Sequence, residues 1–262
     1  PYILPETVGK GYLSKFLKEL PNIVELADGI ITVSNCSKKD ILKFFPIDEN
    51  KIFVTPLAAD KKYKPLEKDK CQYNIKDKYN IKNPFVLYIG GFSSRKNVSS
   101  LITAFSKIHK NLDKNYDLVI IGSNKDELCK LRNLSTDLNI SNNIKFTGFV
   151  EENMLPIFYN ACDVFIYPSL YEGFGLPPLE AMSCGTPVIT SRISSIPEIV
   201  EDGGILIDPF DLKSLMYSME ALLNDENIRN ELSTKALKQS SKYSWEKSSE
   251  KTIKVYKKIL DM

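Results

Sequence analysis

Short apolar strands alternate with amphipathic helices along most of the chain, and this alternation restricts the possible folds more than any other feature. The predicted strands are 85–90, 117–122, 144–148, 163–168, 187–191 and 204–208. Between them lie segments with helical spacing, for example Leu101, Ala104, Phe105 and Ile108. Apolar strands connected by helices form a parallel α/β sheet with helices on both faces. Right-handed crossovers then bring every strand-to-helix loop to one edge of that sheet.

The regions on either side of this run are organised differently. Upstream, the sequence predicts two strands and a helix between them, at 29–34, 51–56 and about 37–45. The polar, lysine-rich stretch 60–78 is interpreted as a linker. Downstream, the chain becomes helical at 212–223, 228–238 and 245–260. The last helix carries several side chains near one face that should dock on the rest of the protein, namely Trp245, Ser249, Thr252, Tyr256 and Leu260.

These features divide the chain into three parts. Residues 1–62 are expected to be the tail of a first domain, 63–240 a complete second domain, and 241–262 a C-terminal helix that packs back toward the first domain. Because the sequence begins with Pro1, we expect a preceding segment to be missing, so that the first domain is largely absent.

Composition excludes several classes of protein. The 262 residues are 43% hydrophobic and 26% charged, as in ordinary globular proteins. Lys and Arg number 35 against 33 Asp and Glu, without a basic stripe, so nucleic acid is not an expected partner. No apolar run reaches the length that spans a bilayer. Five cysteines without paired spacing indicate reduced thiols and a cytoplasmic protein.

Two loops at the predicted sheet edge are candidates for binding. After the strand at 85–90 comes GFSSRKN, in which Gly91 and two serines precede Arg95 and Lys96 at a helix start. Backbone amides at a helix N-terminus with two cations favour a diphosphate, although a solvated turn with surface bases is the simpler reading. The loop 191–204 is interpreted as structural.

The stretch YPSLYEGFGLPPLEAMSCGTPVITS holds two carboxylates and no base. Pro177 and Pro178 predict a helix that begins near Leu176 and carries Glu180 in about its first turn, so that the helix dipole keeps this group ionised. Glu172 lies in the preceding loop. Carboxylates without ion partners accept hydrogen bonds from vicinal hydroxyls. The alternative is that Glu172 caps a turn and that Glu180 is solvated.

This stretch resembles the E-x7-E signature of the family-4 glycosyltransferases, which have the GT-B fold, a pair of Rossmann-like domains. The resemblance covers nearly the whole chain. It includes four more segments in order, ADGIITVSNCSKKDI, VLYIGGFSSRKN, IKFTGFV and IPEIVEDGGILIDPFD, and the closing YSWEKSSEKTIKVY. It implies a retaining hexosyltransferase with a nucleotide-sugar donor and a glycan or lipid-linked acceptor.

The resemblance also implies roles for individual residues. Glu180 would bind the nucleotide ribose and Glu172 the hydroxyls of the donor sugar, while Arg95 and Lys96 would neutralise the diphosphate leaving group. Both carboxylates would then face hydroxyls rather than bases. Backbone groups would contact the sugar, its phosphate or the base at Gly91, Phe149, Val150, Gly173, Phe174, Gly175 and Leu176. The Arg-Lys-Asn variant favours GDP-mannose as the donor.

Some features depart from the family or lie outside its motif. Gly91 stands where the family often has Arg. His109 matches no motif position and is expected to be a surface or half-buried helix residue. The chain has no Asp-x-Asp pair and no metal-ligand spacing, so the resemblance implies transfer without a metal or other cofactor. Contact with the inner face of a membrane is implied by resemblance alone.

Three alternatives remain open at this stage. A non-catalytic fragment that binds a nucleotide sugar is the most serious, because half of the cleft would be absent. A glycoside hydrolase also uses two carboxylates, but one of them must have a raised pKa, which is not expected for Glu180. An NAD-dependent oxidoreductase is the weakest, because the chain lacks the G-x-G-x-x-G fingerprint.

Overall fold

Six of the apolar segments form one parallel sheet in the computed structural model, which describes residues 2–261. The strands are β3 (Phe85–Ile89), β4 (Asp117–Ile121), β5 (Ile144–Gly148), β6 (Val164–Tyr167), β7 (Val188–Ser191) and β8 (Ile205–Ile207). Their order across the sheet is β5-β4-β3-β6-β7-β8, and every pair is parallel. Each strand was predicted to within one residue at either end. The order reverses between β3 and β6, and such a switch point is where ligands bind in open α/β sheets.

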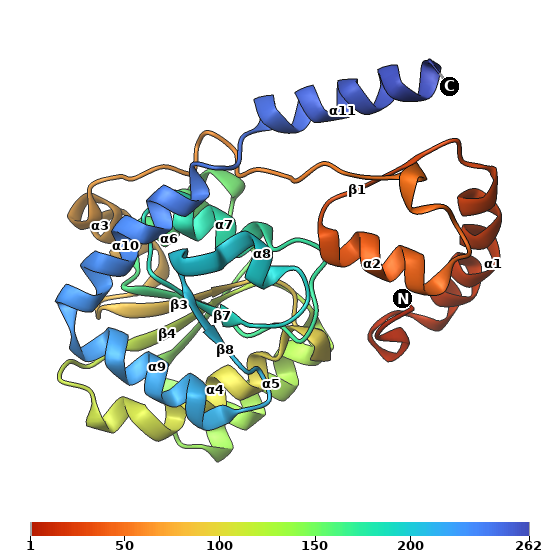
Figure 1. Cartoon of the computed structure of the whole chain (residues 1–262). Coiled ribbons are helices and arrows are strands. Elements are labelled where there is room, and N and C mark those ends of the chain that lie inside the picture. Colours follow the sequence, from red (N-terminus) through yellow and green to blue (C-terminus); the bar gives the residue numbers. More distant parts are fainter. Residues whose placement is uncertain (1, 262) are drawn as a thin grey trace.

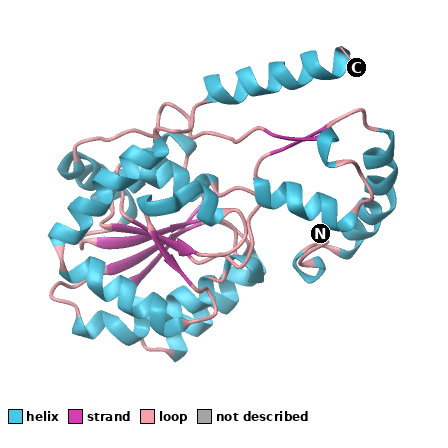
Figure 2. Ribbon diagram, viewed as in Figure 1, coloured by secondary structure: helices cyan, strands magenta, loops and turns pink. Residues whose placement is uncertain are grey.

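Helices cover both faces of this sheet, as the alternation predicts (Figures 1 and 2). One face carries α4 (Val98–Ile108), α5 (Lys125–Asp137) and α9 (Leu212–Asn224). The other carries α3 (Lys68–Tyr79), α6 (Leu155–Ala161), α7 (Leu176–Ser183), α8 (Ile196–Val200) and α10 (Glu226–Ser240). The central strands are buried along their length, with Val86, Leu87 and Val119 fully inaccessible to solvent. The continuous apolar strands of the sequence therefore reflect a sheet that is covered on both sides.

Part of the stretch interpreted as a linker belongs to this lobe. Residues 68–79 form helix α3, which contacts α6 and buries Cys71 and Ile75 in the core. The prediction of a linker was wrong there, because two apolar residues four apart anchor an otherwise polar helix. Only the segment before α3 runs extended between the lobes (Figure 1).

The N-terminal lobe is small. It contains α1 (Lys10–Leu26), β1 (Ile30–Thr32), α2 (Asn35–Phe44) and β2 (Ile52–Val54). Both predicted strands form, and they pair in parallel. Helix α2 begins two residues earlier than predicted, because the Ser34 hydroxyl caps it by accepting from the amide of Ser37 at 3.0 Å.

The C-terminal helix α11 (Trp245–Leu260) extends from the sheet lobe back over the N-terminal lobe (Figure 1). Its docked side is not the predicted one. Ser248 and Val255 are buried, whereas Trp245, Tyr256 and Leu260 are exposed.

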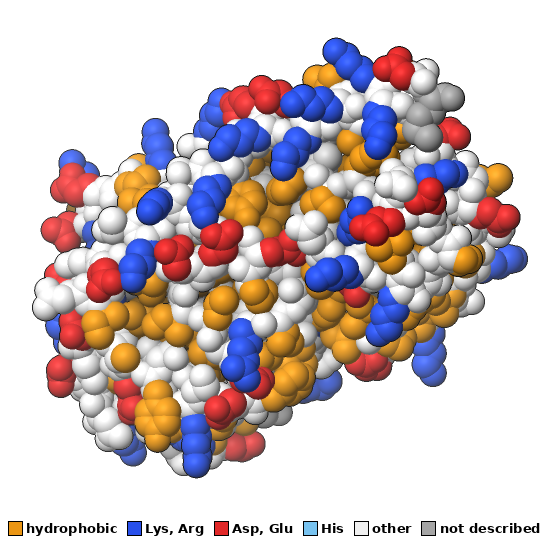
Figure 3. Space-filling view, in the orientation of Figure 1, with side chains coloured by type: hydrophobic (Ala, Val, Ile, Leu, Met, Phe, Trp, Pro, Cys, Tyr) orange, Lys and Arg blue, Asp and Glu red, His pale blue; other side chains and the backbone are white. Residues whose placement is uncertain are grey.

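Other surface features complete the description. Hydrophobic side chains lie between the charged ones on both lobes (Figure 3), and α1 also exposes Tyr12, Ile23 and Leu26. His109 is half-buried at the end of α4, as expected, with Nδ1 3.0 Å from the carbonyl oxygen of Ser106. All five cysteines are free thiols. Within residues 2–261, no helix has the length and hydropathy needed to cross a bilayer.

Candidate active site

Three neighbouring strands end in glycine at the switch-point edge of the sheet. Gly90 follows β3, Gly122 follows β4, and Gly148 ends β5 with a φ of 73°. A side chain at Gly122 would place its Cβ 2.1 Å from the carbonyl oxygen of Gly90, so the backbone turns there admit no Cβ. These glycines keep the sheet edge open beside the loops that carry the candidate residues.

Arg95 and Lys96 converge on Glu172 at this edge. A short 3-10 turn (Ser94–Lys96) after β3 presents the two cations, and Asn97 ends it in the left-handed conformation with φ 55°. Lys96 Nζ lies 2.7 Å and Arg95 Nη1 2.8 Å from Glu172 Oε1. The sequence was therefore wrong to predict that Glu172 faces hydroxyls rather than bases. The loops after β3 and β6 are adjacent at the switch point, which brings these cations to the carboxylate.

The two oxygens of Glu172 have different surroundings. Besides the cations, the hydroxyls of Ser169 and Tyr167 donate to Oε1 at 2.6 and 3.0 Å. Oε2 has no hydrogen-bond partner within residues 2–261. The cluster fixes one carboxylate oxygen and leaves the other to accept from a ligand.

Charge and burial together set the protonation of this cluster. Burial by itself would raise the pKa of Glu172, but Lys96 and Arg95 outweigh it and hold the pKa below its usual value. Burial lowers the pKa of Lys96, and the single carboxylate, shared with Arg95, does not fully restore it. Two cations against one carboxylate give the cluster a net charge of +1, which suits it to a more negative ligand.

Glu180 occupies a different setting. Helix α7 begins at Leu176 as predicted, but Glu180 is its fifth residue and lies beyond the first turn. Its Oε2 accepts from the Tyr159 hydroxyl at 3.0 Å. Burial raises the pKa of Glu180, although hydrogen bonds from Tyr159 and Tyr63 oppose the shift. The pKa of Glu180 is therefore governed by burial and not by the helix dipole, which acts most strongly on the first turn.

The loop that joins Glu172 to α7 offers several unpaired backbone amides. The N–H groups of Gly173, Phe174, Gly175 and Leu176 donate no hydrogen bond to an acceptor among residues 2–261. Gly175 has a φ of 117°, and a side chain there would collide with Ile196 at 2.6 Å. Because Phe174 and Gly175 are buried residues, unpaired amides there indicate a place for a ligand.

Gly91, Phe149 and Val150 flank this edge. Gly91 is exposed, with open space where a side chain would be, and its carbonyl accepts from the Tyr88 hydroxyl at 2.7 Å. Phe149 is 82% exposed just after β5, whereas the neighbouring Val150 is buried. The exposed aromatic ring of Phe149 offers a surface on which the base of a nucleotide could stack.

Residues of the N-terminal lobe complete the site, and the sequence did not single them out. The Tyr171 hydroxyl donates to Asp40, and Glu198 accepts from the backbone amides of Asn35 and Cys36, both at 3.0 Å. A cavity of about 470 Å³ lies between this lobe and the loop that holds Glu172. The sequence signals for these contacts were limited to polar residues at the start of α2 and in the turn at 195–198.

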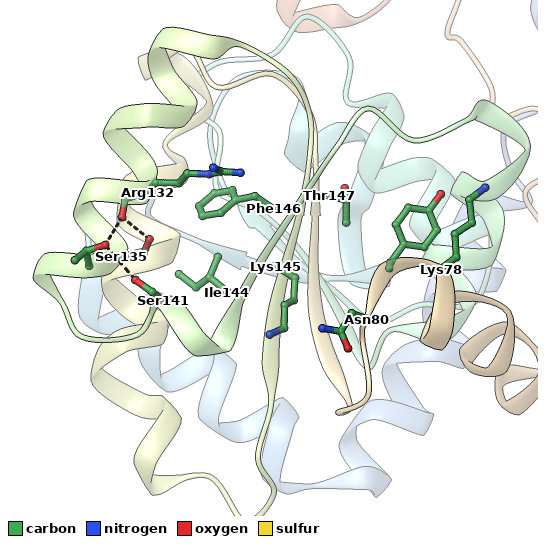
Figure 4. Close-up of a pocket in the computed structure, with 11 residues that line it drawn as sticks. Lys78, Asn80, Arg132, Ser135, Ser141, Ile144, Lys145, Phe146 and Thr147 are labelled. Carbon is green, nitrogen blue, oxygen red and sulfur yellow. Dashed lines mark hydrogen bonds between the residues drawn. The ribbon is translucent and has the colours of Figure 1, made fainter.

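A second cavity, of about 660 Å³, lies beside edge strand β5 (Figure 4). Arg132, Lys145 and Phe146 line it together with hydroxyl side chains. None of the expected site residues described above lines this second cavity. Among residues 2–261, no group of three or more His, Cys, Asp or Glu side chains is arranged to hold a metal ion.

Comparison with known proteins gives this arrangement a family context. The family described as "Glycosyl transferases group 1" matches residues 72–239. O-antigen chain mannosyltransferase B of Escherichia coli is 34% identical over 257 residues, covering 98% of this chain and 67% of that protein. Serotype-specific mannosyltransferase WbdA of Escherichia coli is 31% identical over 240 residues, covering 90% of this chain and 29% of that protein.

Solved structures show the same fold. Sucrose-phosphate synthase from Thermosynechococcus elongatus superposes with a TM-score of 0.82 at 24% identity, over 95% of this chain and 62% of its own. Anabaena Alr3699/HepE in complex with UDP and glucose also gives 0.82, at 19% identity, over 98% of this chain and 69% of its own. The predicted α/β fold of the GT-B type is confirmed. The chain spans about two thirds of the length of O-antigen chain mannosyltransferase B and under a third of that of WbdA.

Proposed function

This chain belongs to the glycosyl transferases group 1 family, and we propose that it serves the retaining transfer of a hexose from a nucleotide sugar to a glycan or lipid-linked acceptor. The observation that carries the proposal is the cluster of Arg95, Lys96 and Glu172 at the switch point, beside a loop with unpaired amides. This arrangement offers cations for a diphosphate and hydrogen-bonding groups for a sugar at one place.

The cations act on the leaving group in this mechanism. The bond from the anomeric carbon to the diphosphate breaks as the acceptor oxygen bonds to that carbon from the same face, and the proton of the acceptor hydroxyl passes to the departing diphosphate oxygen. Arg95 and Lys96 stabilise the charge that develops on the diphosphate, and such stabilisation by one well-placed donor contributes roughly 3–4 kcal/mol. The free Oε2 of Glu172 holds sugar hydroxyls, while Oε1 remains tied to the cations.

The other contacts bind the nucleotide. Glu180 accepts from the ribose hydroxyls, and backbone groups near Phe149 and Val150 contact the base. We propose GDP-mannose as the donor, because the relatives named above are mannosyltransferases. Transfer proceeds without a metal, which accords with the lack of an Asp-x-Asp pair in the sequence. Assignment to family 4 and a place at the inner face of a membrane belong to the same proposal.

Thermal unfolding with nucleotides tests the donor site. GDP, UDP, ADP and their sugar conjugates are added in turn, first with EDTA and then with Mg²⁺ or Mn²⁺. A ligand at a hundred times its Kd adds about 2.7 kcal/mol, which raises Tm by several degrees. We expect the largest shift with GDP-mannose, with no need for metal. Equal, negligible shifts with every nucleotide would contradict the proposal.

A second experiment separates this enzyme from a binding module without catalysis. Such a module would bind the donor but release no sugar to any acceptor. Incubating the chain with GDP-mannose and lipid-linked or free mannosides, and following the release of GDP, separates the two functions. The anomeric configuration of the first product reports retention.

A glycoside hydrolase gains one argument from the structure, since burial raises the pKa of Glu180 as a general acid requires. The family match and the mannosyltransferase relatives favour transfer instead. Release of free sugar from a mannoside in the absence of any nucleotide would reverse this choice.

A further inference from the structure

Serine hydroxyls hold three successive carbonyl groups in the loop between Glu172 and α7. The Ser195 hydroxyl lies 2.9 Å from the carbonyl oxygen of Glu172 and 2.8 Å from that of Phe174. The Ser34 hydroxyl donates to the carbonyl of Gly173 at 2.7 Å, and Ser37 adds a second donor at 3.1 Å. Ser195 and Ser34, which we call the serine clamp, are 0% and 1% exposed.

Fixing a carbonyl also fixes the next amide. A peptide unit is planar and trans, so the N–H of a residue points opposite to the C=O of the residue before it. Ser195 has one hydroxyl hydrogen, which lies between two carbonyl oxygens and orients the amides of Gly173 and Gly175 through one shared hydrogen bond. Ser34 orients the amide of Phe174 in the same way. These are the amides that have no acceptor within residues 2–261. The serine hydroxyls hydrogen-bond to the carbonyl groups of this loop, whereas its N–H groups remain available to a ligand.

The clamp draws on both lobes. Ser195 precedes α8 in the sheet lobe, and Ser34 caps α2 in the N-terminal lobe. Contact between Ser34 and Gly173 thus ties the middle peptide plane to the position of the other lobe. The two outer planes depend on the sheet lobe alone.

We propose that Ser195 and Ser34 are positioning residues that preset the amides of Gly173, Phe174 and Gly175 for the oxygen atoms of the donor's phosphate or sugar. The proposal depends on the proposed function only for the identity of that ligand. A preset amide binds without first reorienting its peptide plane, so the clamp lowers the ordering cost of binding.

Amide NMR of the unliganded protein tests the clamp directly. In Ser195→Ala, resonances of Gly173 and Gly175 should broaden by exchange while that of Phe174 stays sharp. In Ser34→Ala, which leaves only the longer contact from Ser37 to the Gly173 carbonyl, the Phe174 resonance should broaden. In Ser34→Thr, which keeps a hydroxyl, it should stay sharp. A merely structural role would disturb all three amides together. Unchanged spectra in both alanine variants would overturn the proposal.

Calorimetry with GDP-mannose gives the functional readout. Ser195→Ala and Ser34→Ala should each weaken binding about tenfold, the effect of losing roughly one oriented hydrogen bond. Ser135→Ala is the matched control, because the Ser135 hydroxyl is also buried and lies near two carbonyls, at 3.1 and 2.8 Å, but on α5 beside the cavity of Figure 4. Equal weakening in Ser135→Ala would overturn the clamp.

Failure of the proposed function has a different signature. The wild-type protein would then bind no nucleotide sugar, while the residue-specific broadening in the unliganded variants would still support the clamp. Tight wild-type binding that neither alanine variant weakens would reject the clamp and leave the proposed function standing.

Discussion

Lys96 Nζ and Glu172 Oε1 lie 2.7 Å apart, although 76 residues separate them in the chain. The same lysine is proposed to bind the diphosphate of the donor. In the unliganded protein its anionic partner is Glu172. The carboxylate keeps two flexible cationic side chains in place in the unliganded protein. A diphosphate then meets a cluster of net charge +1 that is already ordered.

Replacing Lys96 tests its role in catalysis. Lys96→Ala should reduce turnover about 10²- to 10³-fold, because a donor aimed at the leaving group is lost. The KM for the acceptor should change little. Transfer kinetics with GDP-mannose measure both. Lys68→Ala is the control, since Lys68 pairs with the largely buried Asp163 but lines a different cavity. A wild-type rate in Lys96→Ala would remove Lys96 from the mechanism.

Glu180 is expected to lower the stability of the folded protein at neutral pH and to strengthen nucleotide binding. Its folded pKa lies above the ordinary value of 4.5, so the folded state keeps a proton that the unfolded chain has lost. This group's stabilising contribution is complete below 4.5 and is lost as pH rises through the folded pKa. Glu180→Gln should therefore raise Tm above that window, by about 2–4 °C for each kcal/mol recovered.

The same variant should bind nucleotide about ten- to a hundredfold more weakly, because hydrogen bonds to a charged group contribute about 1.5–3 kcal/mol. Denaturation curves from pH 4 to pH 8, followed by GDP titrations, check the two effects together. A parallel fall in Tm for wild type and variant across that range would contradict the assignment.

Ser194 combines backbone strain with a useful hydrogen bond. It has a φ of 58°, and its hydroxyl accepts from the amide of Glu172 at 3.0 Å. Ser194→Ala loses the acceptor and keeps the strain, so it should destabilise by about 1 kcal/mol. Ser194→Gly loses the acceptor but gains back about 1 kcal/mol of strain, and should be nearly neutral. Urea unfolding compares them, and the reverse order of stability would refute this account.

Glu198 should hold the lobes together. Its carboxylate caps α2 from the opposite lobe, and loss of a cap costs about 1–2 kcal/mol. Glu198→Ala should speed tryptic cleavage at Lys61 or Lys62, in the segment between the lobes. Glu231→Ala, which removes only a pair within one surface helix, should leave cleavage unchanged. Wild-type cleavage rates in Glu198→Ala would show that other contacts fix the lobes.

Periodicity located the sheet well, because buried parallel strands leave continuous apolar runs. It did not find the partner of Glu172. Arg95 and Glu172 belong to loops that are in contact because β3 and β6 are neighbours in the sheet. The periodicity of a single sequence does not determine this strand order. The same limit applies to Ser34 and Ser195, whose hydroxyls act on carbonyls far away in the chain.

Two errors had local physical causes. Glu180 was placed by its distance from a helix start, but its pKa depends on burial against Tyr159, which the helix position does not determine. The docked face of α11 was predicted around Trp245, Tyr256 and Leu260, which are exposed, whereas the buried residues are Ser248 and Val255 on another side of the helix. Close approach of a helix favours small side chains.

The path of α11 has a consequence for the order of folding. Ile259 lies against Gly29, where a side chain would come within 2.5 Å, and Lys258 lies over the ring of Phe53 at 5.0 Å. The N-terminal lobe is thus completed by a helix that comes after the whole sheet lobe in the chain. During synthesis, β1 and β2 remain uncovered until α11 has been made, so the N-terminal lobe should complete its packing only after the sheet lobe has formed.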